Sequence, residues 1–392
     1  MGLRALYLDW PCFKGKDLID SLERDFGHQI IRFFHTDYHE RQSESFLEAF
    51  EEKISREKAD YCISYNFFPL LAEAAHRSNL KYISLVYDCP QVKLYSYRIT
   101  YPTNYVFLFD SILYNKLKRG GIDTVYYSIL PVNAERIRDL KQSESADERL
   151  KADVSFVGSL YNEDHNMFDR MYEKLDLYTK GYLDSIMQAQ LKISGYNFIE
   201  EMLTPALVEC LYKAEQYKKN ADGVETLENI YADYYINRKL TSIERIQLLT
   251  AVAERFPLRL YTLDPKAVIS GACNMGAVDY YTEMPHVFHD SKINLNITLR
   301  SIQSGIPLRC MDIMGCGGFL LTNYQADFLR HFEPEKDFVY YEDEKDLLKK
   351  IDYYLTHEDE RQAIAANGYE KVKREYSFSN VLAHIFTVVG IV

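Results

Sequence analysis

Short apolar runs alternate with amphipathic runs along the first 135 residues of the chain. Runs such as ALYLDW (5–10) and LKYISLVYD (80–88) have the length and continuous hydrophobicity of strands that are buried on both faces. Segments with helical periodicity lie between them, such as SESFLEAFEEKISREK (43–58) and a run that begins with Pro69 at a helix N1 position. This alternation predicts right-handed crossovers and a largely parallel sheet with helices on both faces.

The alternation is interrupted once and then resumes. The strand-like run ADVSFVGSL (152–160) is followed by a long helical block, after which LRLYTL (258–263), AVDYYT (277–282) and KINLNIT (292–298) read as strands. The predicted fold class is α/β, with two Rossmann-like doubly wound domains and a helical insertion in the second. The predicted boundaries are an N-terminal domain at 1–135, a linker at 136–152, a C-terminal domain at 153–375 with the insertion at 161–253, and a C-terminal helix at 376–392.

Composition argues against several classes of protein. The formal net charge is −12 and the basic residues are dispersed, which argues against nucleic acid as a partner. The seven cysteines form no CxxC pair, so we expect reduced thiols and a cytoplasmic location. No apolar run is long enough for a transmembrane helix or a signal peptide, while the apolar end IFTVVGIV (385–392) leaves peripheral membrane contact open.

The segment SGIPLRCMDIMGCGGFLLTN (304–323) has an unusual concentration of glycine, since four of the chain's 17 glycines fall between positions 305 and 318. We predict a strand that ends at Thr298, a short loop, and a helix that starts at Pro307 or Leu308 and ends at Gly315. The start of this helix is expected at the carboxyl edge of the sheet, where open parallel sheets bind their ligands.

The chemistry of this segment suits a nucleoside diphosphate. The first amide groups of a helix carry partial positive charge and can bind phosphate oxygens. Gly305 allows close approach to the backbone, and Arg309 adds a forked pair of donors. Asp312, one turn further on, can accept hydrogen bonds from two ribose hydroxyls. The alternative is an Arg309–Asp312 ion pair on a helix surface, and the spacing alone does not choose between the two.

The run from 284 to 328 resembles the donor-binding core of the GT-B glycosyltransferases and, among them, the CgeB-like (spore-maturation) group. The resemblance rests on SKINLNIT (291–298), a G-x-P-x-R turn (305–309), an acid three residues after the arginine, and a CGG-type end (316–318) before an apolar strand. The first half of the chain is similar to the domain that usually precedes this core, through SYNFFPLLAEAAHRSNLKYISLVYDCP (64–90).

The resemblance implies transfer of a sugar from a nucleotide-sugar, with the acceptor bound by the first domain, the donor by the second, and the C-terminal helix crossing back to the first. It implies that the donor site contains Thr298, Ser304, Gly305, Arg309, Asp312 and Gly317, with Arg309 at the diphosphate and Asp312 at the ribose. Many retaining members of the superfamily carry a glutamate at the position of Ser304, so the stereochemical outcome stays open.

Three aspartates of the first domain follow predicted strands and are candidates for catalysis. Asp88 is the preferred general base, because it follows a long buried strand and precedes a proline; the alternative is a turn aspartate that binds its own backbone. Asp9, beside Trp10, is a second candidate that could line the acceptor site. Asp110 is predicted to be a helix N-cap.

The predicted function is therefore that of a cytoplasmic, metal-independent, hexosyltransferase-like enzyme. His286 and His289 lack further ligands at metal-binding spacing, and no cofactor is expected beyond the UDP-, GDP- or TDP-linked donor. The acceptor is a protein, a glycan or a lipid-linked intermediate. The alternatives are a nucleotide-sugar epimerase or hydrolase of the same fold, and a non-catalytic nucleotide-sugar-binding protein.

Overall fold

The computed structural model describes residues 2–136, 147–164, 166–264 and 267–391. The chain divides into two compact units, of which unit 1 comprises Met1–Pro131, Lys218–Glu225 and Glu375–Val392, and unit 2 comprises Val132–Tyr217 and Thr226–Arg374. Most of the predicted linker falls on 137–146, outside the described residues.

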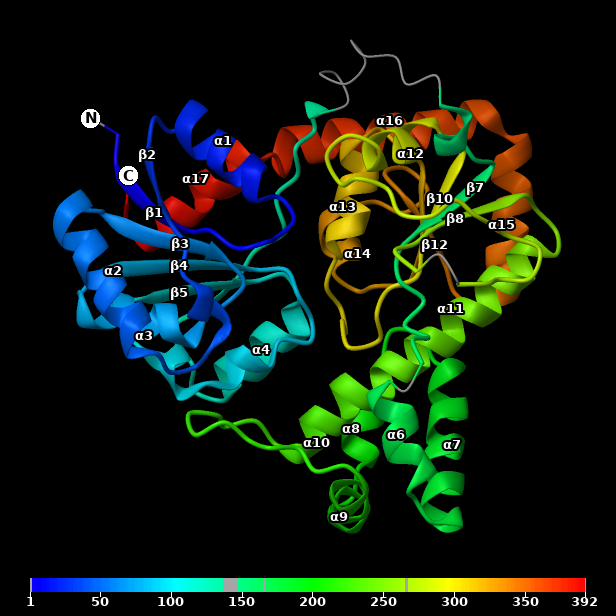
Figure 1. Cartoon of the computed structure of the whole chain (residues 1–392). Coiled ribbons are helices and arrows are strands. Elements are labelled where there is room, and N and C mark those ends of the chain that lie inside the picture. The colour runs from blue at the N-terminus through cyan, green and yellow to red at the C-terminus, as the bar shows by residue number, and fades with distance from the viewer. Residues whose placement is uncertain (1, 137–146, 165, 265–266, 392) are drawn as a thin grey trace. The chain divides into compact units, whose positions relative to one another are not determined.

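Unit 1 contains a parallel sheet of six strands in the order β2-β1-β3-β4-β5-β6. Its strands are β1 Arg4–Leu8, β2 Gln29–Phe33, β3 Tyr61–Tyr65, β4 Lys81–Val86, β5 Asn104–Leu108 and β6 Val125–Tyr127. Helices α1 (Gly15–Arg24) and α17 (Phe378–Val389) cover one face, and α2 (Glu44–Glu57), α3 (Pro69–Arg77) and α4 (Ser111–Arg119) cover the other (Figure 1).

Local sequence signals fix where these helices begin. The Ser43 hydroxyl accepts a hydrogen bond from the amide of Phe46 at the start of α2, and Pro69 opens α3 at its first position. The Asp110 carboxylate accepts bonds from the amides of Ile112 and Leu113 at the start of α4. The prediction that Asp110 caps a helix is confirmed.

Unit 2 contains a second parallel sheet of six strands, in the order β12-β11-β10-β7-β8-β9. Its strands are β7 Val154–Val157, β8 Leu258–Tyr261, β9 Cys273–Asn274, β10 Ile293–Asn296, β11 Leu320–Asn323 and β12 Val339–Tyr341. Helices α12 (Met284–Asp290) and α13 (Leu308–Gly315) lie on one face, and α11 (Asn237–Ala253) and α15 (Glu344–Thr356) lie on the other (Figure 1). Helices α14 (Phe328–His331) and α16 (Glu358–Glu375) complete the C-terminal part. The predicted fold class is confirmed.

One predicted strand of unit 2 is wrong. Residues 277–282 (AVDYYT) form a turn, and the short strand β9 lies before them instead. The Asp279 carboxylate accepts hydrogen bonds from the amides of Tyr281 and Thr282, which closes a local turn in place of strand pairing.

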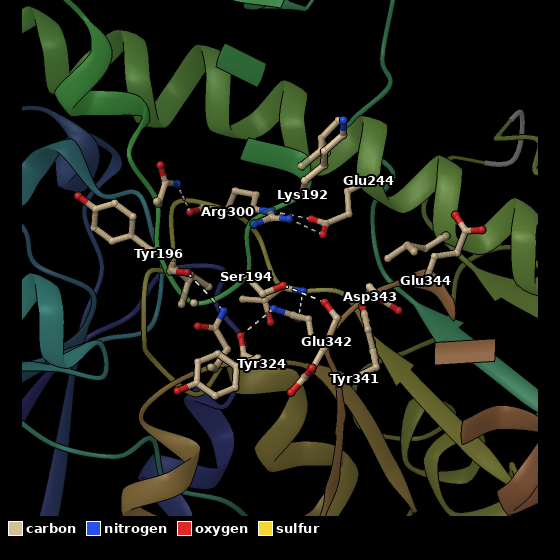
Figure 2. A pocket seen from close by; sticks show the side chains of 18 of the residues that line it. Lys192, Ser194, Tyr196, Glu244, Arg300, Tyr324, Tyr341, Glu342, Asp343 and Glu344 are labelled. Carbon is tan, nitrogen blue, oxygen red and sulfur yellow. Dashed lines mark hydrogen bonds and ion pairs between the residues drawn. The ribbon is translucent and has the colours of Figure 1, made fainter. Parts of the chain in front are cut away.

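The predicted helical insertion follows β7 and ends with α11. Its other elements are α6 Met167–Glu173, α7 Leu177–Leu191, α8 Ile199–Met202, α9 Pro205–Ala214, α10 Leu227–Ile230 and the π-helix η5 Tyr231–Ile236. The α7–α8 connection lies at the carboxyl ends of the strands, where the Ser194 hydroxyl donates a 3.0 Å bond to the carbonyl oxygen of Glu342, just after β12 (Figure 2).

One segment of the insertion, 218–225, packs in unit 1 although its flanks belong to unit 2. The amide of Val224 donates to the carbonyl of Tyr95 over 2.7 Å, and Gly223 forms an antiparallel bridge with Ser96. The buried Asp222 carboxylate accepts a bond from the Ser96 hydroxyl. No pattern in the sequence predicts that this segment of the insertion belongs to unit 1.

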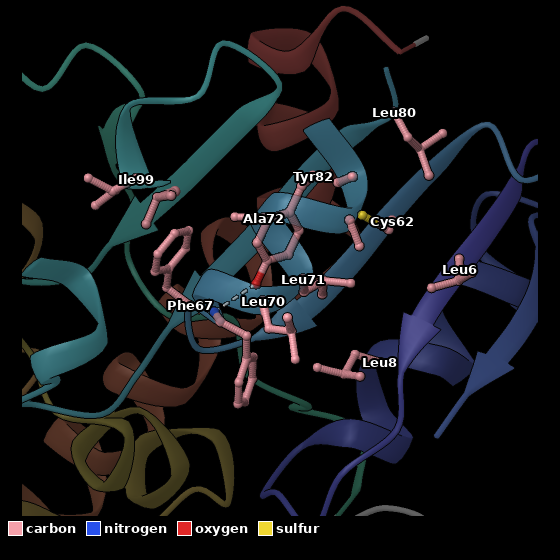
Figure 3. Close-up of a cluster of buried hydrophobic side chains, with 14 of the residues drawn as sticks. Leu6, Leu8, Cys62, Phe67, Leu70, Leu71, Ala72, Leu80, Tyr82 and Ile99 are labelled. Atoms are coloured by element: carbon pink, nitrogen blue, oxygen red, sulfur yellow. Dashed lines mark hydrogen bonds between the residues drawn. The ribbon is translucent and has the colours of Figure 1, made fainter. Parts of the chain in front are cut away.

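Each sheet lies in its own apolar core. In unit 1 every residue of β3 is buried, and the side chains of β3 and β4 pack against those of α3 (Figure 3). The buried Tyr82 hydroxyl is satisfied, because it accepts from the amide of Phe68 and lies 2.7 Å from the Ser64 hydroxyl. Across the described residues, no helix has the length and hydropathy needed to cross a bilayer.

Candidate functional site

The connection from β10 to α13 forms the centre of the candidate site. Strand β10 ends at Asn296, two residues before the predicted end at Thr298. Helix α13 runs from Leu308 to Gly315 with Pro307 as its N-cap, as predicted. No side chain caps the start of this helix. The amides of Cys310 and Met311 donate to the carbonyl oxygen of Pro307, so those of Leu308 and Arg309 remain available to an anion, and the helix dipole adds partial positive charge there.

Two arginine side chains lie beside each other in this part of unit 2. Arg245, buried on α11, donates to the carbonyl oxygen of Ile297 and, over 2.6 Å, to that of Ser159. Arg309, half-buried on α13, has a buried Nε without a hydrogen-bond partner in the described chain. Burial is the main cause that lowers the pKa of each guanidinium. The charge of Arg309 lowers the pKa of Arg245 further, whereas the nearby carboxylate of Asp312 opposes the shift at Arg309. Arginine still stays protonated, so the site carries two positive charges.

Neither guanidinium forms an ion pair with a carboxylate among the described residues. Gly158, at the end of β7, leaves room for Arg309, because a Cβ at this position would lie 3.0 Å from Nη1. The arrangement is a positively charged, partly dehydrated centre next to free helix amides, which is the chemistry that binds phosphate.

Asp312 lies one helical turn after Arg309 and is 5% exposed. The Tyr280 hydroxyl donates to its carboxylate over 3.2 Å. The guanidinium of Arg136 stacks over the ring of Tyr280 at 5.0 Å from the centroid. Because Asp312 is buried and is not ion-paired with Arg309, the alternative of a surface ion pair is wrong. Its predicted contact with a ribose stays a prediction.

Thr298 lies in the loop directly after β10 and is buried. Its amide donates to the side-chain oxygen of Asn323 over 2.8 Å, and its hydroxyl accepts from the side-chain amide of Asn296 over 3.0 Å. These bonds join the ends of β10 and β11. Thr298 thus has a defined structural role at the edge of the site, and its contact with a donor stays a prediction.

Ser304 and Gly305 are buried in the same loop, close to the start of α13. The Ser304 hydroxyl donates to the carboxylate of Asp327 over 3.1 Å. Gly317 instead lies at the opposite end of α13, where its positive φ of 73° ends the helix. The structure therefore gathers Thr298, Ser304, Gly305, Arg309 and Asp312 between β10 and the first turns of α13, and Gly317 stands apart from them.

In unit 1, Asp88 follows β4 and is held by Asn66 at the end of β3. The Asn66 side chain donates to the Asp88 carboxylate over 2.6 Å, and its oxygen accepts from the amides of Tyr87 and Asp88. Asn66 has a positive φ of 59°, a conformation that asparagine tolerates better than most residues. Asp88 is thus bound by a neighbouring loop instead of its own turn.

The pKa of Asp88 is raised, mainly because the surrounding protein withdraws the carboxyl group from water. The bond from Asn66 and the charge of Lys93 oppose this shift. The side chain is nevertheless exposed, so the shift reflects partial dehydration. An exposed carboxylate of raised pKa, fixed by a hydrogen bond, has the properties of a general base.

Lys93, in the 3₁₀ helix η2 (Val92–Tyr95), is a further candidate site residue near Asp88, and it was not predicted from the sequence. Its ammonium group lies 4.3 Å from the centroid of the Phe68 ring. Burial, followed by the nearby charge of Arg41, lowers its pKa to about 8.

Asp9, at the end of β1, forms an ion pair with Arg32 at 3.4 Å. The neighbouring Trp10 ring packs edge-on against Phe68 with 5.5 Å between centroids, and Tyr38 lies 6.2 Å away. The buried Trp10 indole nitrogen has no hydrogen-bond partner in the part of the chain that the structure describes. These residues place an aromatic surface near the strand ends of unit 1.

Comparisons with known proteins agree with this geometry. Residues 245–387, which include Arg245, Arg309 and Asp312, match a family model described as glycosyl transferase-like. Anabaena HepE in complex with UDP-glucose is similar over 100% of both chains, with a TM-score of 0.52 and 9% identity. Sucrose-phosphate synthase from Thermosynechococcus elongatus is similar over 98% of both chains, with a TM-score of 0.53 and 10% identity. A glycosyltransferase from Rickettsia africae is similar over 99% of this chain and 98% of its own, with a TM-score of 0.50 and 11% identity.

The chain has a GT-B glycosyltransferase fold. No curated protein sequence matches it significantly. The two Rossmann-like units of the GT-B fold correspond to the two six-stranded sheets described above.

Within this GT-B fold, His286 and His289 have structural partners. His286 faces Asp290 at 3.7 Å, and the Nδ1 of His289 lies 2.9 Å from the carbonyl oxygen of Cys316. Among the residues that the structure describes, no cluster of three or more histidine, cysteine or acidic side chains is arranged to hold a metal ion.

Arg245 is the main residue of the candidate site that was not predicted from the sequence. It shares the buried stripe of α11 with Thr241, Leu248 and Val252, at helical spacing. A single arginine on an otherwise uncharged stripe was the available signal. Tyr280 and Lys93 gave no such signal, because only the folded chain brings them to Asp312 and Asp88.

Proposed function

We propose that the protein is a glycosyltransferase that moves a sugar from a nucleoside-diphosphate donor to an acceptor hydroxyl without a metal ion. The observation that carries this proposal is the pair Arg245 and Arg309, two guanidinium groups without a carboxylate partner beside the uncapped start of α13. A dehydrated double positive charge is costly unless an anion binds, and a diphosphate supplies two adjacent negative groups.

The same groups account for the chemistry of the leaving group. As the bond from the sugar to the diphosphate breaks, negative charge develops on the departing oxygen. Two guanidinium groups and the amides of a helix start can stabilise that charge by electrostatic preorganisation. Asp312, buried one turn further, is suited to accept hydrogen bonds from the ribose. A divalent cation is not needed for this step.

Unit 1 supplies the group that deprotonates the acceptor in this proposal. Asp88 is the general base, positioned by Asn66, and Asp9 with Trp10 borders the acceptor. A base is required if the transfer inverts the anomeric centre. The acceptor is a protein, a glycan or a lipid-linked intermediate in the cytoplasm, reached with or without peripheral contact with a membrane.

Two further points support the donor class and the subgroup. HepE, which shares the fold, is known in complex with UDP-glucose, which favours a UDP-hexose as donor. The residues from 284 to 328 resemble the CgeB-like group, which favours a hexosyltransferase of that kind.

The test is a binding and turnover series on the full chain. Thermal shift and calorimetry with UDP, GDP, TDP and CMP should show binding of a nucleoside diphosphate and weaker binding of CMP. The corresponding nucleotide-sugar should then be consumed only when an acceptor is added. Consumption without an acceptor would instead favour a hydrolase or an epimerase. Binding without consumption across an acceptor panel would favour a non-catalytic binding protein, and failure of all four nucleotides to bind would refute the proposal.

A further inference from the structure

Unit 2 contains a pocket of about 170 Å³ between the sheet and the helical insertion (Figure 2). The loops after β10, β11 and β12 form one side of it. The α7–α8 connection, at 191–197, and α11 form the other. Its volume is that of several water molecules, so the pocket can hold one sugar-sized ring.

The pocket is separate from the arginine pair. Glu244 lines it, whereas the next residue, Arg245, points to Ile297 and Ser159 on the other side of the sheet end. Neither Arg309 nor Asp312 lines it. Of the residues that we predicted to bind the donor, only Thr298 reaches this pocket.

The walls of the pocket are held by specific bonds. Arg300 makes two hydrogen bonds to the carboxylate of Glu244, at 2.8 and 2.6 Å, and both side chains are mostly buried. The side chain of Asn197 donates to the carbonyl of Arg300 over 2.8 Å. These bonds join the loop after β10, helix α11 and the α7–α8 connection around a preformed cavity.

One polar group at this pocket has no partner. Tyr341, at the end of β12, is 3% exposed, and its hydroxyl makes no hydrogen bond in the described structure. Tyr341 lines the pocket. A buried hydroxyl without a partner is unfavourable, so a ligand hydroxyl that bonds to it restores a satisfied site.

The other lining groups point to an uncharged polyol. The carboxylates Glu244, Glu342, Asp343 and Glu344 outnumber the cations Lys192 and Arg300, which disfavours a phosphate. Five primary amides and three tyrosines also line the pocket. Amides both donate to and accept from sugar hydroxyls, and tyrosine rings present an apolar face with a polar edge.

We propose that this pocket binds one neutral sugar unit, as a second saccharide site apart from the nucleotide-binding centre. The geometry combines an unpartnered buried hydroxyl, a fixed ion pair and a ring of amides in a cavity that the helical insertion closes. The insertion thereby gains a role, namely to complete a carbohydrate site at the ends of β10, β11 and β12.

Saturation-transfer NMR and titration with the methyl α-glycosides of glucose, galactose, mannose and N-acetylglucosamine test this proposal. At least one glycoside should bind saturably at millimolar concentration. Tyr341→Phe should weaken its affinity about 3- to 10-fold, the effect of one neutral hydrogen bond. Tyr340→Phe is the matched control, because Tyr340 is the adjacent residue of β12 and does not line the pocket, and its affinity should equal that of the wild type.

Three further measurements complete the test. Gln247→Trp, at an exposed position on α11, should block the glycoside without affecting folding, and it replaces Tyr341→Phe if that variant does not fold. Arg309→Ala should still bind the glycoside. The proposal is overturned if none of the four glycosides binds, if Tyr340→Phe weakens binding as much as Tyr341→Phe, or if UDP alone displaces the glycoside, since the pocket would then belong to the donor site.

Discussion

Unit 1 and unit 2 each contain a pair of neighbouring arginine side chains, and the charges of the two pairs are balanced differently. In unit 1, Arg41 lies 3.3 Å and Arg98 lies 3.7 Å from the carboxylate of Asp222, and Arg98 also pairs with Glu73. In unit 2, Arg245 and Arg309 have no carboxylate partner in the described chain.

The difference separates a structural site in unit 1 from the proposed binding site in unit 2. The unit 1 pair is neutralised by the chain itself and fixes the segment 218–225 in place. In unit 2, carbonyl oxygens hold the guanidinium of Arg245 without cancelling its charge, and the buried Nε of Arg309 has no hydrogen-bond partner in the described chain. Two positive charges without a partner are tolerated in a protein when an anionic ligand completes the site.

The largest expected effect tests whether unit 1 supplies the general base while unit 2 binds the donor. Asp88→Asn should lower kcat about 10²- to 10⁴-fold, because it removes the proposed general base, and should leave the affinity for UDP unchanged. Steady-state kinetics and calorimetry on the same preparation measure the two quantities. Equal losses of rate in Asp88→Asn and in the control Asp352→Asn, on the outer helix α15, would contradict this role.

The neutralised pair of unit 1 should be the more important for stability. Asp222→Ala removes the carboxylate partner of Arg41 and leaves Arg98 with Glu73 alone, and it should lower the free energy of unfolding by about 3 to 5 kcal/mol. Urea denaturation measures this change. Glu209→Ala, which breaks an exposed pair with Lys213, should change it by less than about 1 kcal/mol. Similar losses in the two variants would remove the contrast.

The unpaired arginines of unit 2 should be the more important for binding. Arg309→Ala should weaken UDP binding by about 1.5 to 3 kcal/mol, the range for a charged hydrogen bond. It should not lower the free energy of unfolding as Asp222→Ala does, because it removes an uncompensated charge. Calorimetry and urea denaturation check both statements, with the exposed Arg255→Ala as control. If the Arg309 variant kept full affinity for UDP, the nucleotide assignment would fail.

The smallest expected effect is a dependence of stability on pH that comes from Lys93. Its pKa falls from the usual 10.5 to about 8 in the folded chain, so between pH 8 and 10 the unfolded chain binds more protons. The free energy of unfolding should therefore rise with pH in this window, and the rise should be smaller in Lys93→Met. Denaturation at pH 8 and pH 10 measures the difference. The exposed Lys345→Met should keep the wild-type rise.

Much of the fold could be predicted because its signals are local. The buried strands β3 and β4, the proline that starts α3 and the limits of α13 all follow from neighbouring residues. The turn at 277–282 was missed, because its apolar residues suit a strand while Asp279 bonds to its own loop. The position of 218–225 was missed because Asp222 meets Arg41, which lies 181 residues earlier in the chain.

The candidate site was predicted in part for the same reason. The spacing of Arg309 and Asp312 on one helix was visible in the sequence. The structure places Arg309 at the start of α13 and Asp312 one turn further along it. Arg245, which lies beside Arg309, and Tyr280, which bonds to Asp312, come from other segments of the chain. No sequence pattern predicts that either residue lies near α13.

Glu244 and Arg245 are consecutive residues on α11, yet Glu244 lines the pocket and Arg245 lies in the arginine pair, where we propose that the donor phosphates bind. A helix is stiff, so it cannot reorient one of these side chains by turning on its axis without reorienting the other. If ligands on the two sides favour different angles of α11, binding on one side changes the affinity on the other, and thermodynamic reciprocity then requires the same coupling free energy in both directions.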